Sequence, residues 1–444
     1  MYLKIAKSIS FVFLFMNCFS QENTSYKEVD SLSYVAFMNN NWEEAKSIAK
    51  VAYKEGVSFY YLHLRVGILA YNIENYDEAI FHFEVANEMN PEDSTCLEYL
   101  YYAYVFGGQL DLAQKLAYNQ KKSFQNKIGY TDKRKIESIG FSSLNILTDN
   151  IQKGKDIRII NSGDLYGSSV FNGRVQGISL NMSHKVSPSV RLINQVALFS
   201  SFSNSREVFN INAHEVNREY VNKQFQYNFV GSYLMNNKLD LAFGLALFKM
   251  NADYSTTQLI NSPNVSFLTN DIPLSYSNSL FSFSISKKYR YIKPKLEMGY
   301  NNLYNKKQLQ VEGEIIVFPF GNNKVYSQTS FVNISREYGF NYVLNQKMGV
   351  RLNKYSWLEL GTRLGDLTNY QTSNGLIIYN SADKVKQEFS LFFNLFLKKV
   401  DVSLGYAIQA KEGIFFSYSN EQDYSINRYN YTSNNIITVV KWKF

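Results

Sequence analysis

The stretch Leu239-Asp240-Leu241-Ala242-Phe243-Gly244-Leu245-Ala246-Leu247 alternates large apolar residues with small or polar ones. The same period of two recurs over residues 389–397 and 402–408. Successive side chains of a β-strand point to opposite faces, so each stretch would carry large apolar groups on one face. A water-soluble sandwich and a barrel that crosses a membrane both contain such strands. The pattern predicts a β-rich body and leaves both architectures open.

The length of the alternating segments favours the membrane barrel. A tilted strand needs about 9–11 residues to cross a bilayer, whereas strands of soluble sheets most often have about 5–6. Segments of the crossing length occupy residues 225–234, 239–248, 309–318, 342–352 and 358–367. Tight polar turns are predicted at 185–188, 236–237, 321–323 and 354–356, and long outer loops at 201–222, 250–278 and 411–433. Short turns at one end and long loops at the other are typical of outer-membrane barrels.

We therefore predict an antiparallel transmembrane β-barrel of about fourteen strands over residues 131–444. The strands are expected near residues 136–145, 173–185, 189–202, 223–235, 238–250, 279–289, 292–304, 308–320, 324–336, 341–353, 357–369, 386–398, 401–412 and 434–444. An even number of strands returns the chain to the side on which it started. Both ends of the barrel segment are therefore expected on the periplasmic side.

The last strand ends in aromatic residues. Ile436, Thr438, Val440, Trp442 and Phe444 fall on one face of it. A chain that ends in an aromatic residue after an alternating strand resembles the signal that outer-membrane barrels present to their assembly machinery. The resemblance implies that Trp442 and Phe444 form this signal, with the barrel-assembly machinery and outer-membrane lipid as partners.

Residues 1–20 read as a secretory signal peptide. Lys4 and Lys7 give a positive start, Ile9–Met16 a short apolar core, and Cys18-Phe19-Ser20 a cleavage site before Gln21. Cleavage would leave Cys96 as the last cysteine, so no intramolecular disulfide is expected. After residue 20 no apolar run approaches the roughly 20 residues of a membrane helix. These features predict export and exclude a bundle of membrane helices.

A 34-residue period is present in residues 21–130. Ala45, Ala79 and Ala113 recur at this spacing, in copies that span 26–59, 60–93 and 94–127. The middle copy also has the residues Gly67, Tyr76, Phe83, Ala86 and Pro91 at positions of helix packing and helix ending. Gly67 and Ala79 would allow two helices to approach closely, and Pro91 would end the second helix.

These residues resemble the tetratricopeptide repeat. The resemblance implies helix pairs stacked into a short solenoid, whose concave face binds a protein or peptide. A spacer that only folds is the alternative. The predicted fold class is thus α plus β: a short tetratricopeptide solenoid followed by the barrel. In outline this order resembles exopolysaccharide export porins, whose repeat scaffolds are much longer, and small outer-membrane barrels with short repeat domains.

Charged residues on the less apolar strand faces are expected inside the barrel, because a charge on the lipid face costs about 2–4 kcal/mol near the midplane. The predicted lumen residues are Lys293, Lys295, Glu297, Gln310, Glu312, Glu314, Lys347, Arg351, Glu359 and Arg363. They could line a selective aqueous path or form a charge network that fills a narrow barrel. Residues 128–444 carry 35 Lys and Arg against 23 Asp and Glu, and this positive charge suits an anionic solute or anionic lipid. Residues 26–127 are acidic, with 9 Lys and Arg against 14 Asp and Glu.

The sequence gives no pattern typical of catalysis. The chain has four histidines. His63 and His82 lack Cys or carboxylates at metal-ligand spacing and are interpreted as packing or surface residues. His184 and His214 are expected at opposite ends of the barrel, without a nucleophile motif. We therefore expect no enzyme activity, metal, cofactor or nucleic-acid partner.

The predicted function is a non-enzymatic outer-membrane barrel that supports transport or export, whose periplasmic repeats recruit a protein or peptide. A structural barrel that anchors a binding scaffold is the first alternative. An outer-membrane hydrolase is the second.

Overall fold

The computed structural model describes residues 25–131, 136–235, 238–261, 265–303, 306–337, 339–420 and 422–444. The predicted signal peptide and the predicted turn at Asn236-Asn237 lie outside these ranges. The chain divides into two compact units between Ala113 and Gln114. None of the helices in the described ranges combines the length and apolar character needed to span a membrane.

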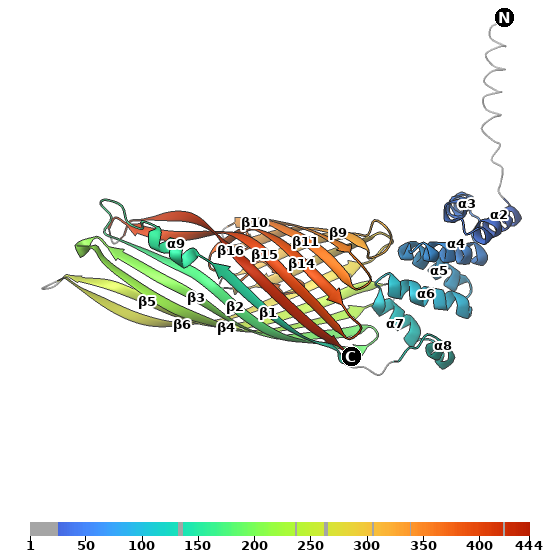
Figure 1. Ribbon diagram of the computed structural model, residues 1–444, viewed down its shortest axis with the longest axis horizontal. Coiled ribbons are helices and arrows are strands. Elements are labelled where there is room, and N and C mark those ends of the chain that lie inside the picture. Colours follow the sequence, from blue (N-terminus) through green and yellow to red (C-terminus); the bar gives the residue numbers. More distant parts are fainter. Residues whose placement is uncertain are drawn as a thin grey trace, which may run out of the picture. The chain divides into compact units, whose positions relative to one another are not determined.

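The helices of the N-terminal region repeat with the period seen in the sequence (Figure 1). Helices α2, α4 and α6 begin at residues 26, 60 and 94, and α3, α5 and α7 begin at 42, 76 and 110. Asn41 and Asn75, which precede α3 and α5, each accept a hydrogen bond from a backbone N–H of the first helical turn. The bounds are α2 Tyr26–Met38, α3 Trp42–Lys54, α4 Tyr60–Asn72, α5 Tyr76–Met89, α6 Ser94–Phe106, α7 Leu110–Tyr118 and α8 Lys122–Lys127.

Small residues lie where these helices approach most closely. Ala45, Ala79 and Ala113 are all at most 1 % exposed. A Cβ atom on Gly67 would come within 2.6 Å of the Phe83 ring, so a larger residue would displace that ring. The other predicted packing positions are Ala86, fully buried, Tyr76, half-buried against Phe106, and Pro91, exposed just after α5 ends.

Fourteen antiparallel strands of the described residues close into one barrel, as the alternation predicts. Strand β1 closes it by pairing with β16, over Ser138–Thr148 and Lys443–Ser433. Trp442 lies in this closing pair opposite Ile139, and the Phe444 N–H donates to the Glu137 carbonyl at 3.0 Å. The strands are β1 Ile136–Thr148, β2 Tyr166–Ser187, β3 Val190–Phe209, β4 His214–Leu234, β5 Leu239–Asn261, β6 Val265–Lys287, β7 Ile292–Asn301, β8 Gln308–Val317, β9 Val325–Arg336, β10 Gly339–Arg351, β11 Ser356–Gly365, β14 Lys384–Phe396, β15 Val400–Tyr418 and β16 Tyr424–Lys443.

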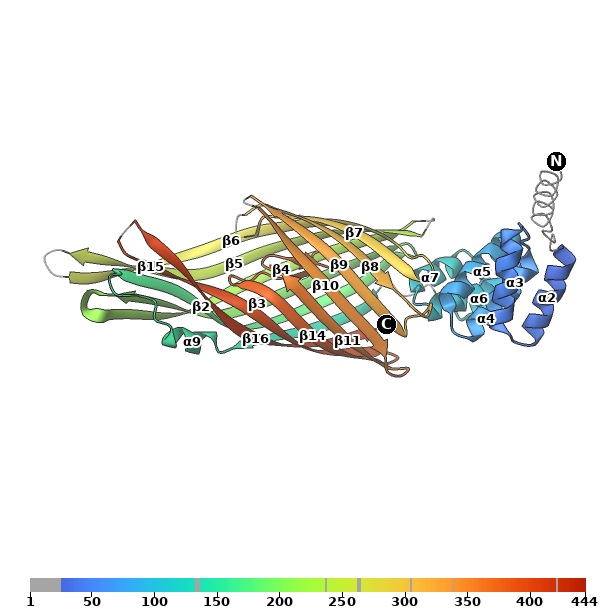
Figure 2. The same cartoon turned by 90° about the horizontal axis from the view of Figure 1, so that it is seen from above.

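The prediction of long outer loops at 201–222, 250–278 and 411–433 is wrong. Strands β3 to β6, β15 and β16 have 19 to 23 residues and continue through these segments. Figure 2 shows them projecting past the shorter strands at the far end of the barrel, the end away from Ile136 and Phe444. Ladder hydrogen bonds need no apolar face, so polar segments can continue a strand although they lose the alternation that reveals it.

The connection between β11 and β14 is also not a plain outer loop. Residues 366–383, here called the inner loop, contain a two-stranded sheet of β12 (Gln371–Thr372) and β13 (Ile377–Ile378). The link between β1 and β2 carries helix α9 (Asn150–Asp156), and η1 (Ile211–Ala213) forms the turn before β4.

Candidate functional site: the barrel interior and its inner loop

The outward face of the barrel is apolar. Leu360 on β11 is 54 % exposed and Phe331 on β9 is 54 % exposed, whereas the inward Glu297 and Gln310 are each 1 % exposed. Other outward side chains with large exposed areas are Leu296, Met298, Leu309, Leu344, Met348, Phe389, Leu391 and Leu404. A closed antiparallel barrel with an apolar outer face and a polar interior is the architecture of outer-membrane barrels.

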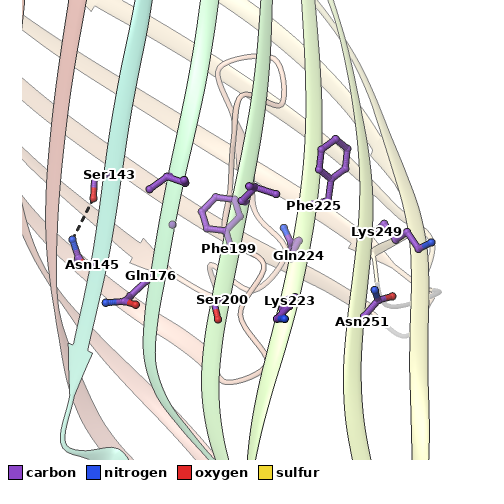
Figure 3. Close-up of a pocket in the computed structure, with 13 residues that line it drawn as sticks. Ser143, Asn145, Gln176, Phe199, Ser200, Lys223, Gln224, Phe225, Lys249 and Asn251 are labelled. Atoms are coloured by element: carbon purple, nitrogen blue, oxygen red, sulfur yellow. Dashed lines mark hydrogen bonds between the residues drawn. The ribbon is translucent and has the colours of Figure 1, made fainter.

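The exposed apolar side chains of the outer face are here called the apolar belt. On β3 to β5 this belt is followed by polar residues. Leu198 and Phe225 are outward cross-strand partners, and two residues nearer the far end the partners are Ser200 and Lys223. Lys249 is paired with Phe225 at the same level of the wall. Figure 3 shows these residues around a pocket in the wall. Lysines at this level can extend their ammonium groups into water while their stems stay in lipid. On β3 to β5 the far-end extensions therefore begin at this polar level.

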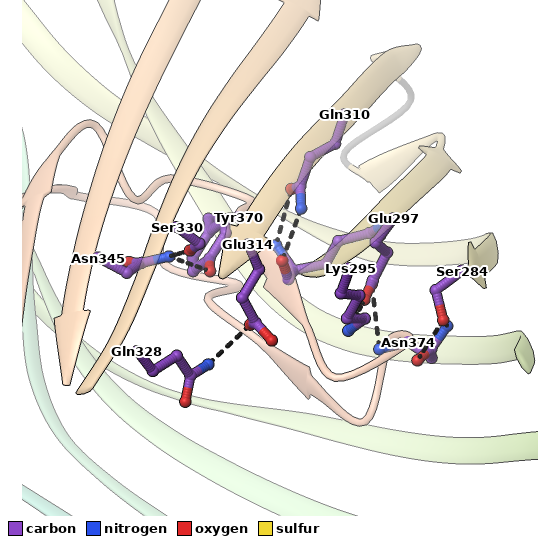
Figure 4. Close-up of polar contacts among 11 residues, drawn as sticks. Ser284, Lys295, Glu297, Gln310, Glu314, Gln328, Ser330, Asn345, Tyr370 and Asn374 are labelled. Atoms are coloured by element: carbon purple, nitrogen blue, oxygen red, sulfur yellow. Dashed lines mark hydrogen bonds and ion pairs between the residues drawn. The ribbon is translucent and has the colours of Figure 1, made fainter. Parts of the chain in front are cut away.

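Four predicted lumen residues come together on β7 and β8. Lys295 Nζ lies 2.6 Å from Glu297 Oε2. Glu297 is the cross-strand partner of Glu312, and Lys295 that of Glu314. Glu314 accepts a hydrogen bond of 2.7 Å from Gln328 on β9. The acidic side chains around Lys295 thus form one buried polar cluster, as Figure 4 shows for most of them.

The remaining predicted lumen residues are spread along the wall. Lys347 Nζ lies 3.7 Å from Glu359, but Arg351 is exposed and donates to the Asn353 carbonyl of the next turn. Lys293 is half-buried near the same end of the barrel. The partner of Arg363 is Glu388 on β14, a residue that the sequence reading did not select.

The inner loop occupies the space beside the acidic cluster. The Gln310 side chain donates to the Gln371 carbonyl at 2.7 Å and accepts from the Gln371 N–H at 3.2 Å. The Asn374 N–H donates to Glu297 Oε1 at 3.0 Å. These bonds, drawn in Figure 4, attach the loop backbone to strands β7 and β8. Glu297 and Gln310 therefore bind the inner loop and are not free lumen groups.

The inner loop crosses the barrel. Asn380 Nδ2 donates to Gln224 Oε1 on β4 at 2.7 Å. Strand β4 lies seven places from β11 in the ring of fourteen, so the loop leaves one wall and reaches the opposite one. Near its end, Asp383 accepts from Asn172 at 2.8 Å and from Tyr431 at 2.5 Å. The loop is thus bonded around most of the interior.

Apolar packing and glycines also hold the inner loop. Leu367 and Tyr370 are at most 1 % exposed and pack with Val332, Ile334, Val343 and Val385. Ile378 packs against a second cluster formed by Ala246, Phe248, Leu280 and Leu303. On the wall, a Cβ atom at Gly299 would overlap the Gln371 side chain, and one at Gly244 would overlap the Asn374 carbonyl. The missing Cβ atoms make room for the loop.

A local signal for the inner loop was present in the sequence. Asn374-Gly375 lies between β12 and β13, and both residues have positive φ, of 55° and 82°. An Asn-Gly pair between short apolar or β-forming segments is a strong hairpin signal. The signal predicts the turn, but nothing local states that the hairpin folds inward.

The other candidate residues do not meet. His184 lies near the β2–β3 turn and His214 begins β4 at the far end, so the two are at opposite ends of the barrel. Trp442 and Phe444 are 48 % and 52 % exposed. Among the described residues, no group of three or more His, Cys, Asp or Glu has the geometry to hold a metal ion.

Known proteins resemble the chain only in outline. No family model matches it, and no curated protein matches it. A Pseudomonas aeruginosa FadL homologue has 6 % identity and a TM-score of 0.44, covering 69 % of this chain and 90 % of its own. The P. putida toluene transporter TodX has 8 % identity and a TM-score of 0.44, covering 74 % and 94 %. The translocator domain of the autotransporter NalP from Neisseria meningitidis has 7 % identity and a TM-score of 0.30, covering 77 % and 100 %.

Proposed function

We propose that this protein is an outer-membrane barrel that passes a polar solute, and that the inner loop forms the constriction. The observation that carries the proposal is the bond between Asn380 and Gln224, which ties a loop from one wall to the opposite wall. A loop that crosses a polar lumen reduces the free cross-section to whatever space its side chains leave. Pore dimensions and the groups that line them decide which solutes pass.

The charges beside the inner loop support a polar solute. Lys295, Glu297, Glu312 and Glu314 lie on adjacent strands within one cluster. Several buried polar atoms near the loop make no hydrogen bond to protein atoms, among them Glu312 Oε2 and the Gln371 side-chain atoms. Buried polar atoms of this kind are usually satisfied by water. A hydrated path along the loop is consistent with these groups.

We also propose that the N-terminal helices are a tetratricopeptide module on the periplasmic side that recruits a protein or peptide. The helix starts at 34-residue spacing and the buried Ala45, Ala79 and Ala113 support the repeat assignment. An even strand number supports placing both ends of the barrel on one side. Exposed aromatic residues such as Tyr34 and Tyr61, which flank Arg65, would provide contact area for a partner.

Replacement of residues 367–382 by a short Gly-Ser linker tests the transport proposal. In planar bilayers we expect low conductance from the native barrel and a several-fold increase from the linker variant. Heat-dependent mobility in SDS would show that both barrels are folded. Equal conductance of the two folded barrels would contradict the proposal.

A structural barrel is the second candidate, because the inner loop packs like a core. Tyr370 is 1 % exposed and lies in an apolar cluster with residues of three strands. If the loop is a permanent filling, the linker variant should lose much of its thermal stability and remain silent in bilayers. The protein would then be a membrane anchor for the helical module.

A further inference from the structure

Three polar atoms of the helical region meet between helices α3, α4 and α5. His63 Nδ1 lies 3.1 Å from His82 Nδ1. The Tyr53 hydroxyl oxygen lies 3.4 Å from His63 Nδ1 and 3.3 Å from His82 Nδ1. The three atoms form a nearly equilateral triangle, although the residues come from three different helices.

The triangle has the size of one face of a metal coordination sphere. In tetrahedral zinc sites the metal–nitrogen distance is about 2.0–2.1 Å, which places neighbouring ligand atoms about 3.3–3.4 Å apart. The observed edges of 3.1, 3.3 and 3.4 Å lie close to these values. An ion above this face would have two imidazole nitrogens and a phenol oxygen as ligands, with a fourth position left for water.

The far nitrogen of each imidazole lies near a side-chain oxygen, within hydrogen-bond distance for His63 only. His63 Nε2 lies 2.9 Å from Ser58 Oγ, and His82 Nε2 lies 3.6 Å from Glu78 Oε1. Metal-bound histidines usually donate the second ring N–H to such an oxygen, which fixes the tautomer and the ring orientation. A proton on each Nε2 would leave a lone pair on each Nδ1.

Both histidines lie inside the helical region. They are 3 % and 2 % exposed. Tyr53 is half-buried. An ion could therefore enter beside Tyr53.

We propose that His63 Nδ1, His82 Nδ1 and the Tyr53 oxygen bind one divalent transition-metal ion. Imidazole ligands suit zinc, copper and nickel, whereas magnesium and calcium prefer oxygen ligands. The ion links the first predicted repeat, which contributes Tyr53, to the second, which contributes both histidines. This inference is independent of the transport proposal.

Sequence spacing could not show this site. Tyr53 and His63 are ten residues apart and His82 follows nineteen residues later, so no local motif exists. The three side chains converge only because the helices pack at the 34-residue repeat. The sequence reading therefore placed both histidines among packing or surface residues and expected no metal.

Equilibrium dialysis of the full chain against Zn²⁺ tests the proposal, in detergent and without a polyhistidine tag. We expect one Zn²⁺ per chain and no matching uptake of Mg²⁺. His82→Gln should weaken binding at least a hundredfold, and Glu78→Gln about 10–100-fold through loss of ring orientation. His214→Gln, in the barrel, is the matched control and should bind as the native chain does.

Failure of the native chain to bind Zn²⁺, or binding that survives His82→Gln, would overturn the proposal. If His82→Gln does not fold, Tyr53→Phe decides the matter, because it keeps the ring and removes only the oxygen. With Co²⁺ as a visible probe, Tyr53→Phe should change the absorption spectrum of the bound ion. An unchanged spectrum and affinity would remove Tyr53 from the site.

Discussion

Apolar side chains point inward in the helical region and outward in the barrel. Leu62 in α4 is 0 % exposed, whereas Leu360 in β11 is 54 % exposed. Helices in water must turn their leucines inward, while a barrel in lipid turns them outward and keeps its polar groups inside. Position relative to the core, and not residue type, therefore decides what a substitution does in each region.

The largest contrast is expected from one substitution made in both regions. Leu62→Ala should cost about 2–5 kcal/mol, because it leaves a cavity in a packed core. Leu360→Ala should cost less than about 1 kcal/mol, because lipid chains can fill the space that the side chain leaves. Chemical unfolding followed by a fluorescent probe on each region would measure both values. Equal losses would contradict the outward orientation of Leu360.

A charged residue placed on the outer face would show where the apolar belt ends. Leu360→Arg should cost about 2–4 kcal/mol, the value for a basic residue near the membrane midplane. Ile426→Arg is the matched control, since Ile426 is 53 % exposed on the far-end extension of β16, beyond the belt. Its effect should be within about 0.5 kcal/mol, as for other surface positions. A large loss from Ile426→Arg would show that the belt continues along the extension.

Overpacking can separate the two regions. Ala79→Trp should cost about 1–3 kcal/mol or more, because Ala79 is fully buried between helices. A few repeats have little stability to lose, so the helices should open. Cys96 reports this opening: it is buried, and burial raises the pKa of its thiol to about 12. A thiol reagent should label Cys96 in the variant and not in the native chain, while the barrel keeps its heat-dependent mobility in SDS. Loss of both regions together would show that they fold as one.

The smallest effect is expected at a wall glycine. Gly299→Ala places a methyl group on the Gln371 side chain, which must move away. Stability should fall by about 1 kcal/mol or less, because the displaced group is the end of a flexible side chain. Bilayer conductance should nevertheless rise. Gly313→Ala is the matched control, since a Cβ atom there meets nothing within 4 Å. The same conductance in both variants would show that Gln371 does not limit passage.

The repeated patterns were predictable because each follows from local geometry. The period of two predicted a barrel of fourteen strands, and the predicted repeat copies begin where α2, α4 and α6 begin. The far-end extensions were missed because a strand in water on both faces has no alternation to read. Strand length there is set by ladder hydrogen bonds with neighbours that are distant in sequence.

The inward-facing strand residues of the site were predictable from the sequence, whereas the position of the inner loop was not. Glu297 and Glu312 were expected inside because lipid would not accept them, and both are at most 3 % exposed. The role of Glu297 as an acceptor for the Asn374 N–H depends on where the inner loop lies. That placement results from contacts between residues about 60 to 160 positions apart, such as Gln310 with Gln371 and Gln224 with Asn380. No local pattern encodes such contacts.

Cross-linking tests directly whether the inner loop spans the lumen and reaches the opposite wall of the barrel. In a Cys96→Ser background, Asn380→Cys and Gln224→Cys should be joined by a short bifunctional thiol reagent in intact cells, because the native side chains lie 2.7 Å apart. Asn380→Cys with Phe225→Cys is the control pair, since the outward Phe225 is 46 % exposed and on the other face of β4. The account predicts efficient cross-linking of the first pair only. Absence of that cross-link in the folded barrel, or equal cross-linking of both pairs, would contradict a loop that spans the lumen.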